Sequence, residues 1–195
     1  DEPDETLTVN SIIGSLKIKK VDADTGTTTP SGGATLTGAK FAVDRCSNGS
    51  SCNANSNDGW TRVSEKELTA SDGILTWDNL PEGYFKVYET QAGNGYILNT
   101  GNIKTFNIVS DGQIIDYSAN QADWFTNTVI KGSIKITKRR TVNKDVNNVM
   151  TSMPEPFHGV IFDIYHNSFV AGNLVDTLTT DSNGEATTAV LPFES

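Results

Sequence analysis

The chain has 195 residues, which suits one or two domains, and 24 acidic against 15 basic side chains give it a formal net charge of -9. An acidic surface repels phosphate backbones and anionic lipids, so we expect neither nucleic-acid binding nor membrane association. No apolar run approaches the roughly 20 residues of a membrane helix, so we expect no membrane insertion in this segment.

Short strand-like runs separated by turn residues follow one another along the chain. They cover 15–21, 40–45, 60–64, 73–77, 84–90, 104–109, 113–117 and 124–130. Turn signals such as Asp24-Thr25-Gly26 and Asp111-Gly112 lie between them. This spacing predicts an all-β sandwich of the Ig-like kind, with one short helix possible over 65–70.

The sequence repeats itself. GSLKIKK at 14–20 matches GSIKITK at 132–138, residues 36–43 resemble 157–164, and 72–81 resemble 183–192. We therefore expect a complete module over 14–131, the N-terminal half of a second over 132–195, and in 1–13 the tail of a preceding module or a linker. Asn10 is interpreted as a last-strand asparagine of that preceding module. Half a sandwich exposes apolar faces, so strands from outside this chain are expected to complete the second module.

Cys46 and Cys52 flank a short polar loop rich in Ser, Asn and Gly. Such a pair predicts a small disulfide clip and an oxidising, extracellular setting. A metal pair would need two further ligands, and both His158 and His166 are distant in sequence. Two free thiols are the remaining alternative.

Strand parity places three polar residues on apolar faces. Side chains two apart share a face, so Lys20 follows Ile18, Glu89 follows Val87, and Asn127 lies between Phe125 and Val129. Burial makes a lysine a neutral amine and a glutamate a neutral acid. If the three meet, the amine can attack the carboxamide, expel ammonia and leave an isopeptide bond. In the second module, Lys138 occupies the place of Lys20.

Each residue also has an ordinary interpretation. A lysine at a strand end usually extends its amine to solvent, a glutamate forms a salt bridge, and an asparagine bonds backbone. Parity alone leaves these alternatives open.

The same residues lie in motifs that resemble the Cna B-type, SpaA-like pilin domain of Gram-positive bacterial surface proteins. The motifs are LKIKKVD at 16–22, LTGAKF at 36–41, NLPEGY at 79–84, YETQA at 88–92 and Gly95-Tyr96. The resemblance implies tandem prealbumin-like, Ig-related sandwiches, a Lys20–Asn127 isopeptide cross-link, Glu89 as the catalytic residue, and Lys138 as the cross-link lysine of the second module. Gly93 departs from the family, where proline is usual.

The resemblance implies a structural stalk or shaft module on the bacterial cell surface, cell-wall anchored or in a pilus, whose partners are neighbouring modules. The alternative is an adhesive module that binds a host matrix protein or glycan. A polymerising major pilin would need a reactive-lysine motif and a sorting signal, and neither is visible. The self-reaction occurs once, so we expect no enzyme in the ordinary sense, no cofactor and no metal. Asp22-Ala23-Asp24 and the segment 181–185 are more typical of turns than of calcium loops.

Overall fold

The computed structural model describes residues 11–194, and over that range the chain is all-β. Its helical segments there are two short 3₁₀ turns, Gln121–Asp123 and Ala171–Asn173. The predicted fold class is therefore confirmed. Asn10, and most of the predicted tail or linker at 1–13, lie outside the described residues.

Contacts group the chain into two compact units. Unit 1 comprises the described residues up to Ile130 and those from Phe193, and unit 2 comprises Lys131–Pro192. Phe193 packs against the core of unit 1, where its carbonyl accepts a bond of 2.7 Å from the Gly33 amide.

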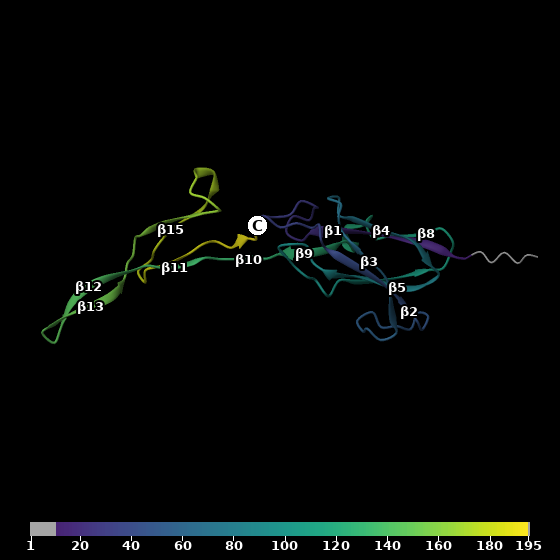
Figure 1. Ribbon diagram of the computed structural model, residues 1–195, viewed down its shortest axis with the longest axis horizontal. Coiled ribbons are helices and arrows are strands. Elements are labelled where there is room, and N and C mark those ends of the chain that lie inside the picture. Colours follow the sequence, from purple (N-terminus) through teal and green to yellow (C-terminus); the bar gives the residue numbers. More distant parts are fainter. Residues whose placement is uncertain (1–10, 195) are drawn as a thin grey trace, which may run out of the picture. The chain divides into compact units, whose positions relative to one another are not determined.

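Unit 1 is a sandwich of two sheets (Figure 1). The first sheet has the order β4-β1-β9-β6, with β8 also paired to β1, and the second has the order β3-β2-β5-β7. The strands of the first sheet are β1 (Ile13–Asp22), β4 (Ile74–Pro81), β6 (Tyr96–Ile97), β8 (Gln113–Asp116) and β9 (Phe125–Val129). Those of the second are β2 (Lys40–Cys46), β3 (Trp60–Glu67), β5 (Gly83–Gln91) and β7 (Ile103–Ile108).

The core of unit 1 lies between these sheets. Alternating side chains of each strand point inward, because successive residues of a strand face opposite sides. The largest fully buried side chains include Trp77, Phe41, Phe85 and Phe125. This apolar layer surrounds the inward-facing polar residues that parity identified.

The predicted strands of unit 1 all overlap observed ones, whereas β6, only two residues long, was not predicted. The prediction of a helix over 65–70 is wrong. Strand β3 continues to Glu67 because residues 65–67 pair with 40–42 of β2. The ladder with β2 satisfies backbone groups that a helix would have bonded internally.

Strand β1 has three neighbours. It is antiparallel to β4, parallel to β8 along its first half, and parallel to β9 along its last residues. In the pairing of β1 with β9, the register partners are Lys20 and Phe125, Val21 and Thr126, and Asp22 and Asn127. The first and last strands of unit 1 are therefore direct neighbours.

Unit 2 consists of four two-stranded pairs: β10 with β17, β11 with β16, β12 with β13, and β14 with β15. The bounds are β10 (Lys131–Gly132) with β17 (Leu191–Pro192), β11 (Lys135–Thr137) with β16 (Glu185–Thr187), β12 (Arg139–Val146) with β13 (Val149–Pro156), and β14 (Ile161–Tyr165) with β15 (Leu174–Thr179). Asn147 and Asn148 turn the β12–β13 hairpin with φ angles of 57° and 64°. Two left-handed residues suit a two-residue hairpin turn, and asparagine tolerates that conformation.

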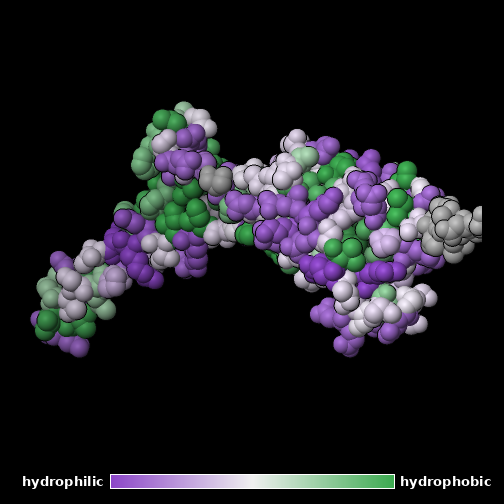
Figure 2. All heavy atoms as spheres, turned by 45° about the vertical axis from the view of Figure 1, so that its right-hand side comes forward, coloured by the Kyte–Doolittle hydropathy of each residue, from purple (hydrophilic) through white to green (hydrophobic). Residues whose placement is uncertain are grey.

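Unit 2 leaves most of its large apolar side chains in solvent. Among the described residues, Leu178 is its one buried hydrophobic side chain. The exposed ones are Ile134, Val146, Val149, Met150, Met153, Phe157, Ile161, Phe169, Val170, Leu174, Val175 and Val190. Figure 2 shows hydrophobic atoms, in green, at the surface of this unit. Strands of such composition normally bury one face.

Candidate functional site

Strand β1 carries a lysine into the core. Leu16, Ile18 and Lys20 alternate along its inner face, and all three residues have 0% exposure. Gly73 lies beside the C-terminal end of β1, where its carbonyl accepts a 2.8 Å hydrogen bond from the Lys20 amide. A side chain at residue 73 would place its Cβ 2.2 Å from the Lys20 carbonyl oxygen, so only glycine fits.

Glu89 and Asn127 reach the same interior from two other strands. Glu89 follows Phe85 and Val87 on the inner face of β5. Asn127 lies between Phe125 and Val129 on the inner face of β9. Both are buried, with 4% and 1% exposure. The structure thus places all three predicted residues of unit 1 inside the sandwich.

The three side chains meet, with Glu89 in the middle. Lys20 Nζ donates to Glu89 Oε2 at 3.2 Å, and Asn127 Nδ2 donates to Glu89 Oε1 at 2.9 Å. Because β1 and β9 are neighbours in one sheet while β5 lies in the other, the carboxyl group bridges the sandwich. Asn127 Oδ1 is buried without a hydrogen-bond partner.

Aromatic rings wall this group off from water. Lys20 Nζ lies 6.0 Å from the centroid of the Phe41 ring, and Phe41 packs edge-on against Phe125 with 5.1 Å between centroids. Such a setting disfavours charge on both partners. Burial lowers the pKa of Lys20 to about 8, although the Glu89 charge opposes the shift. Burial raises the pKa of Glu89, and Lys20 and Asn127 offset this only in part.

A fourth inward-facing polar residue, Asp22, was interpreted from the sequence as part of a turn and not as a buried residue. It also lies on the inner face of β1, two residues beyond Lys20 and paired in register with Asn127. Its carboxylate accepts bonds from the amides of Asp24, Thr25 and Ser31 and from the hydroxyl of Tyr96. Burial raises the pKa of Asp22, but these bonds outweigh it and hold the pKa below its ordinary value. The parity that identified Lys20 also identifies Asp22.

In the two turns that were weighed against calcium loops, the carboxylates of Asp22 and Asp181 accept hydrogen bonds from nearby groups of the chain. Asp22 caps the turn that follows β1, and Asp181 accepts bonds from the amides of Asn183 and Glu185. No group of three or more potential metal ligands occurs within residues 11–194.

The predicted disulfide between Cys46 and Cys52 is present, with 5.8 Å between the Cα atoms. It closes the start of the 47–59 loop, which lies on the outer face of the second sheet. Trp60 Nε1 donates to the Asn53 carbonyl at 2.9 Å, and Lys86 Nζ donates to the Ser56 carbonyl at 3.0 Å. The clip is on the opposite side of β5 from Glu89.

Removing the disulfide by a Cys46→Ser, Cys52→Ser double substitution is expected to destabilise unit 1 by about 2 kcal/mol, because the loop it closes is short. The loop should become sensitive to protease, whereas the buried lysine, glutamate and asparagine should be unaffected. Denaturant unfolding and limited proteolysis measure both effects. A loss of buried-site integrity in this variant would contradict the separation of clip and site.

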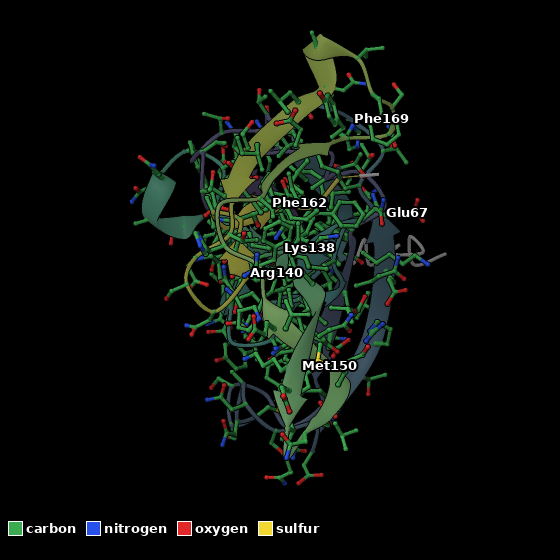
Figure 3. The ribbon with its side chains drawn as sticks, turned by 90° about the vertical axis from the view of Figure 1, so that its left-hand side faces the viewer. Glu67, Lys138, Arg140, Met150, Phe162 and Phe169 are labelled. Carbon is green, nitrogen blue, oxygen red and sulfur yellow. A yellow bond between two sulfur atoms is a disulfide. The ribbon has the colours of Figure 1, made fainter. Side chains whose placement is uncertain are left out.

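Lys138 differs from Lys20. Lys138, labelled in Figure 3, lies between β11 and β12 and is exposed to solvent. Its backbone is nevertheless held like that of Lys20, since the Lys138 amide donates to the Gly184 carbonyl at 2.6 Å. No buried glutamate or asparagine accompanies it among the described residues of unit 2. Its role as a cross-link lysine stays a prediction.

Comparison with known families assigns the fold. Residues 14–123 match the model of the SpaA prealbumin-like fold domain, which covers more than half of the chain. The chain belongs to this family. Unit 1 is thus a pilin-type, Ig-like structural module, and the resemblance inferred from the motifs is confirmed. A comparison with curated proteins gave no match.

The chain is also similar to several solved structures. The Bacillus anthracis TIE protein is similar over 94% of this chain and 27% of its own length, with 24% identity and a TM-score of 0.62. The major pilin SpaD from Corynebacterium diphtheriae matches 94% of this chain and 52% of its own, with 15% identity and a TM-score of 0.45. A streptococcal ancillary pilin matches 95% and 52%, with 17% identity and a TM-score of 0.42. The chain therefore spans from about a quarter to about half of these proteins.

Within residues 11–194 of the SpaA-type chain, no helix is long and apolar enough to cross a membrane.

Proposed function

We propose that this chain is a stalk or shaft segment of a Gram-positive surface adhesin or pilin, and that unit 1 is stiffened by an autocatalytic Lys20–Asn127 isopeptide bond that Glu89 assists. The observation that carries the proposal is the Glu89 carboxyl group, which bonds the amine on one side and the carboxamide on the other in a dry core.

The reaction begins with a proton transfer. Lys20 passes a proton to Glu89, which leaves a neutral amine and a neutral acid, the forms that burial favours. The free electron pair of Nζ then attacks Asn127 Cγ and forms the new C–N bond. The bond from Cγ to Nδ2 breaks, Glu89 donates its proton to the leaving nitrogen and takes up the proton that the attacking Nζ loses, and one ammonia molecule departs. The products are a secondary amide and ammonia, so no oxidant or cofactor enters the balance.

The unpartnered Asn127 Oδ1 fits this chemistry. A protonated Glu89 is a hydrogen-bond donor, and half a turn of the carboxamide would present Oδ1 to it. That orientation polarises the carbonyl for attack and satisfies the buried oxygen. Amides react slowly with amines in water, so the rate must come from geometry, where effective molarities reach about 10⁵ M or more.

The position of the bond suits a load-bearing module. It would join the first and last strands of unit 1, which are neighbours in one sheet. Force applied through adjoining modules would then pass from β1 to β9 through a covalent bond and would bypass the strands between them. An amide is also insensitive to redox conditions, whereas the Cys46–Cys52 clip favours an extracellular, oxidising location.

The tryptophans favour a stalk over an adhesive module. Trp77 is buried in the core, Trp60 packs on Tyr84, and Lys19 Nζ covers Trp124 at 4.4 Å from the ring centroid. The three rings therefore do not line one groove in which a glycan or peptide could stack.

The second module is proposed to extend over 132–195 and to be completed by strands from outside this chain. The internal repeat and the exposed apolar side chains of unit 2 support this, because the matching part of unit 1 is covered by β5, β7 and β9. Neighbouring modules of the same surface protein are the proposed partners. In such a completed module, burial of Lys138 would be the first requirement for a second cross-link.

Intact-mass measurement tests the proposal. The purified full chain should lack the mass of one ammonia molecule in addition to the two hydrogens of the disulfide. Digestion should yield one branched peptide that joins the segments around Lys20 and Asn127. A mass that lacks only the disulfide hydrogens would overturn the proposal.

A further inference from the structure

The hydrogen bond between Asp22 and Tyr96 crosses the strand that carries Asn127. In the first sheet β9 lies between β1 and β6. Asp22 belongs to β1 and Tyr96 to β6, and the Tyr96 hydroxyl donates to Asp22 Oδ2 at 2.7 Å. Both side chains are buried, with 0% and 6% exposure. The bond therefore ties together the two strands that flank β9.

This tie lies beside the reacting carboxamide. Asp22 is the register partner of Asn127 across the parallel pair, while Tyr96 pairs with Val129, two residues further along β9. The inner-face side chains of Asp22, Asn127 and Tyr96 therefore come from β1, β9 and β6 in turn. Asn127 is the one in the middle.

The backbone of Asn127 is held by its strand and by a 2.9 Å bond from the Ala23 amide to its carbonyl, but its side chain has less support. Strand β9 has five residues, its pairing with β1 covers three positions, and β6 has only two residues. Among residues 11–194, the Asn127 side chain makes one hydrogen bond, from Nδ2 to Glu89. A cross-linking reaction depends on placement to within about an ångström, and short ladders alone permit larger excursions.

Asp22 is well suited to hold position without entering the chemistry. Its two oxygens are occupied by the amides of Asp24, Thr25 and Ser31 and by Tyr96. These donors stabilise its negative charge locally, while the pKa of Lys20 is affected by burial and by Glu89. Two nearby carboxyl groups thus differ: Asp22 stays ionised and structural, while Glu89 is pushed toward the neutral acid.

We propose that Asp22 and Tyr96 form a clamp across β9 and act as positioning residues that hold the Asn127 carboxamide within reach of the Lys20 amine. The clamp rests on the proposed cross-linking function and adds to it two residues whose hydrogen bonds go to other groups than the Lys20 amine and the Asn127 carboxamide.

The test compares linking rates in the full chain. Wild type, Tyr96→Phe and the control Tyr117→Phe are dissolved in denaturant directly after synthesis, checked by mass for the unlinked form, and refolded by dilution. Tyr117 also packs on the core and donates its hydroxyl to a backbone carbonyl, that of Thr105, at 2.8 Å. Loss of ammonia is followed by intact mass, and folding by the fluorescence of the buried Trp77.

Tyr96→Phe should fold and yet link at least about tenfold more slowly than wild type, whereas Tyr117→Phe should link at the wild-type rate. Sucrose, which favours the folded state, should not restore the rate, because folding is not what limits it. A folded Tyr96→Phe chain that links as fast as wild type would overturn the clamp.

Two further outcomes are separable. If wild type itself never loses ammonia, the cross-link proposal has failed, and the clamp falls with it. If Tyr96→Phe does not fold, the Asp22→Asn variant tests the clamp instead. This substitution keeps the shape of the side chain but replaces one hydrogen-bond-accepting oxygen with a donating amide nitrogen. A folded Asp22→Asn chain with the wild-type linking rate would then reject the clamp.

Discussion

A Glu89→Gln chain is expected to fold like wild type but to remain unlinked. Its mass should therefore still include the ammonia that the cross-linking reaction releases. Glutamine has nearly the shape of glutamate and can still accept a bond from Lys20, but it cannot take up and return a proton. General acid–base groups contribute typically about 10²–10⁴-fold to rates, so linking should slow by at least about 100-fold. Intact mass against time after refolding measures the effect.

The matched control is Glu65→Gln, which makes the same chemical change in an exposed side chain that pairs with Arg62. This variant should link fully. If Glu89→Gln also lost ammonia at the wild-type rate, Glu89 would have no part in the mechanism.

The pH dependence of the wild-type rate gives a second measure of the same role. Lys20 and Glu89 titrate as a pair, and the reactive form, neutral amine with neutral acid, contains one exchangeable proton. The rate should fall above pH of about 8, where the pair loses that proton, because burial lowers the pKa of Lys20 to about 8. It should fall again at low pH, below the raised pKa of Glu89, where the pair gains a second proton.

Unlinked unit 1 is expected to be less stable than linked unit 1 by about 4–5 kcal/mol, because the bond would close a loop between residues 107 positions apart in the sequence. For a module of this size the melting temperature should fall by roughly 15–25 °C. Calorimetry of wild type and of two unlinked variants, Glu89→Gln and Lys20→Met, measures the difference.

These two variants lack the bond for different reasons, one without its proton carrier and the other without its nucleophile. Similar losses in both would assign the effect to the missing bond. Lys17→Met serves as the control, since Lys17 lies on the opposite face of β1 and should not influence linking. Unlinked variants that melt at the wild-type temperature would contradict the proposed stabilisation.

The period of two along a strand made Lys20, Glu89 and Asn127 visible in the sequence, because apolar neighbours on both sides define the buried face. The same parity applies to Asp22, but the predicted strand ended at residue 21 and Asp22 was assigned to the turn that follows. That Tyr96 would reach it depended on β6, which is too short to show a pattern. Pairing across strands depends on register, and a single sequence contains no information on which distant segments lie side by side.

Lys138 shows the limit of motif matching. Its local sequence repeats that of Lys20, and its backbone makes the equivalent bond to a glycine carbonyl. Its side chain is exposed because burial is a property of the covering sheet, which unit 2 does not contain. The helix expected over 65–70 was wrong for a related reason, since pairing with β2 overrode the local preference of that segment.

Joining Lys20 to Asn127 would convert everything between them into a closed ring. An extended polypeptide can thread through a narrow secretion channel as a single strand, whereas a cyclised segment would have to enter the channel as two strands side by side. The buried triad forms only when the sandwich is assembled, so the condensation would be delayed until the chain has emerged and folded. Transport would thus precede fusion, and each linked molecule would carry a permanent covalent mark of having folded after passage.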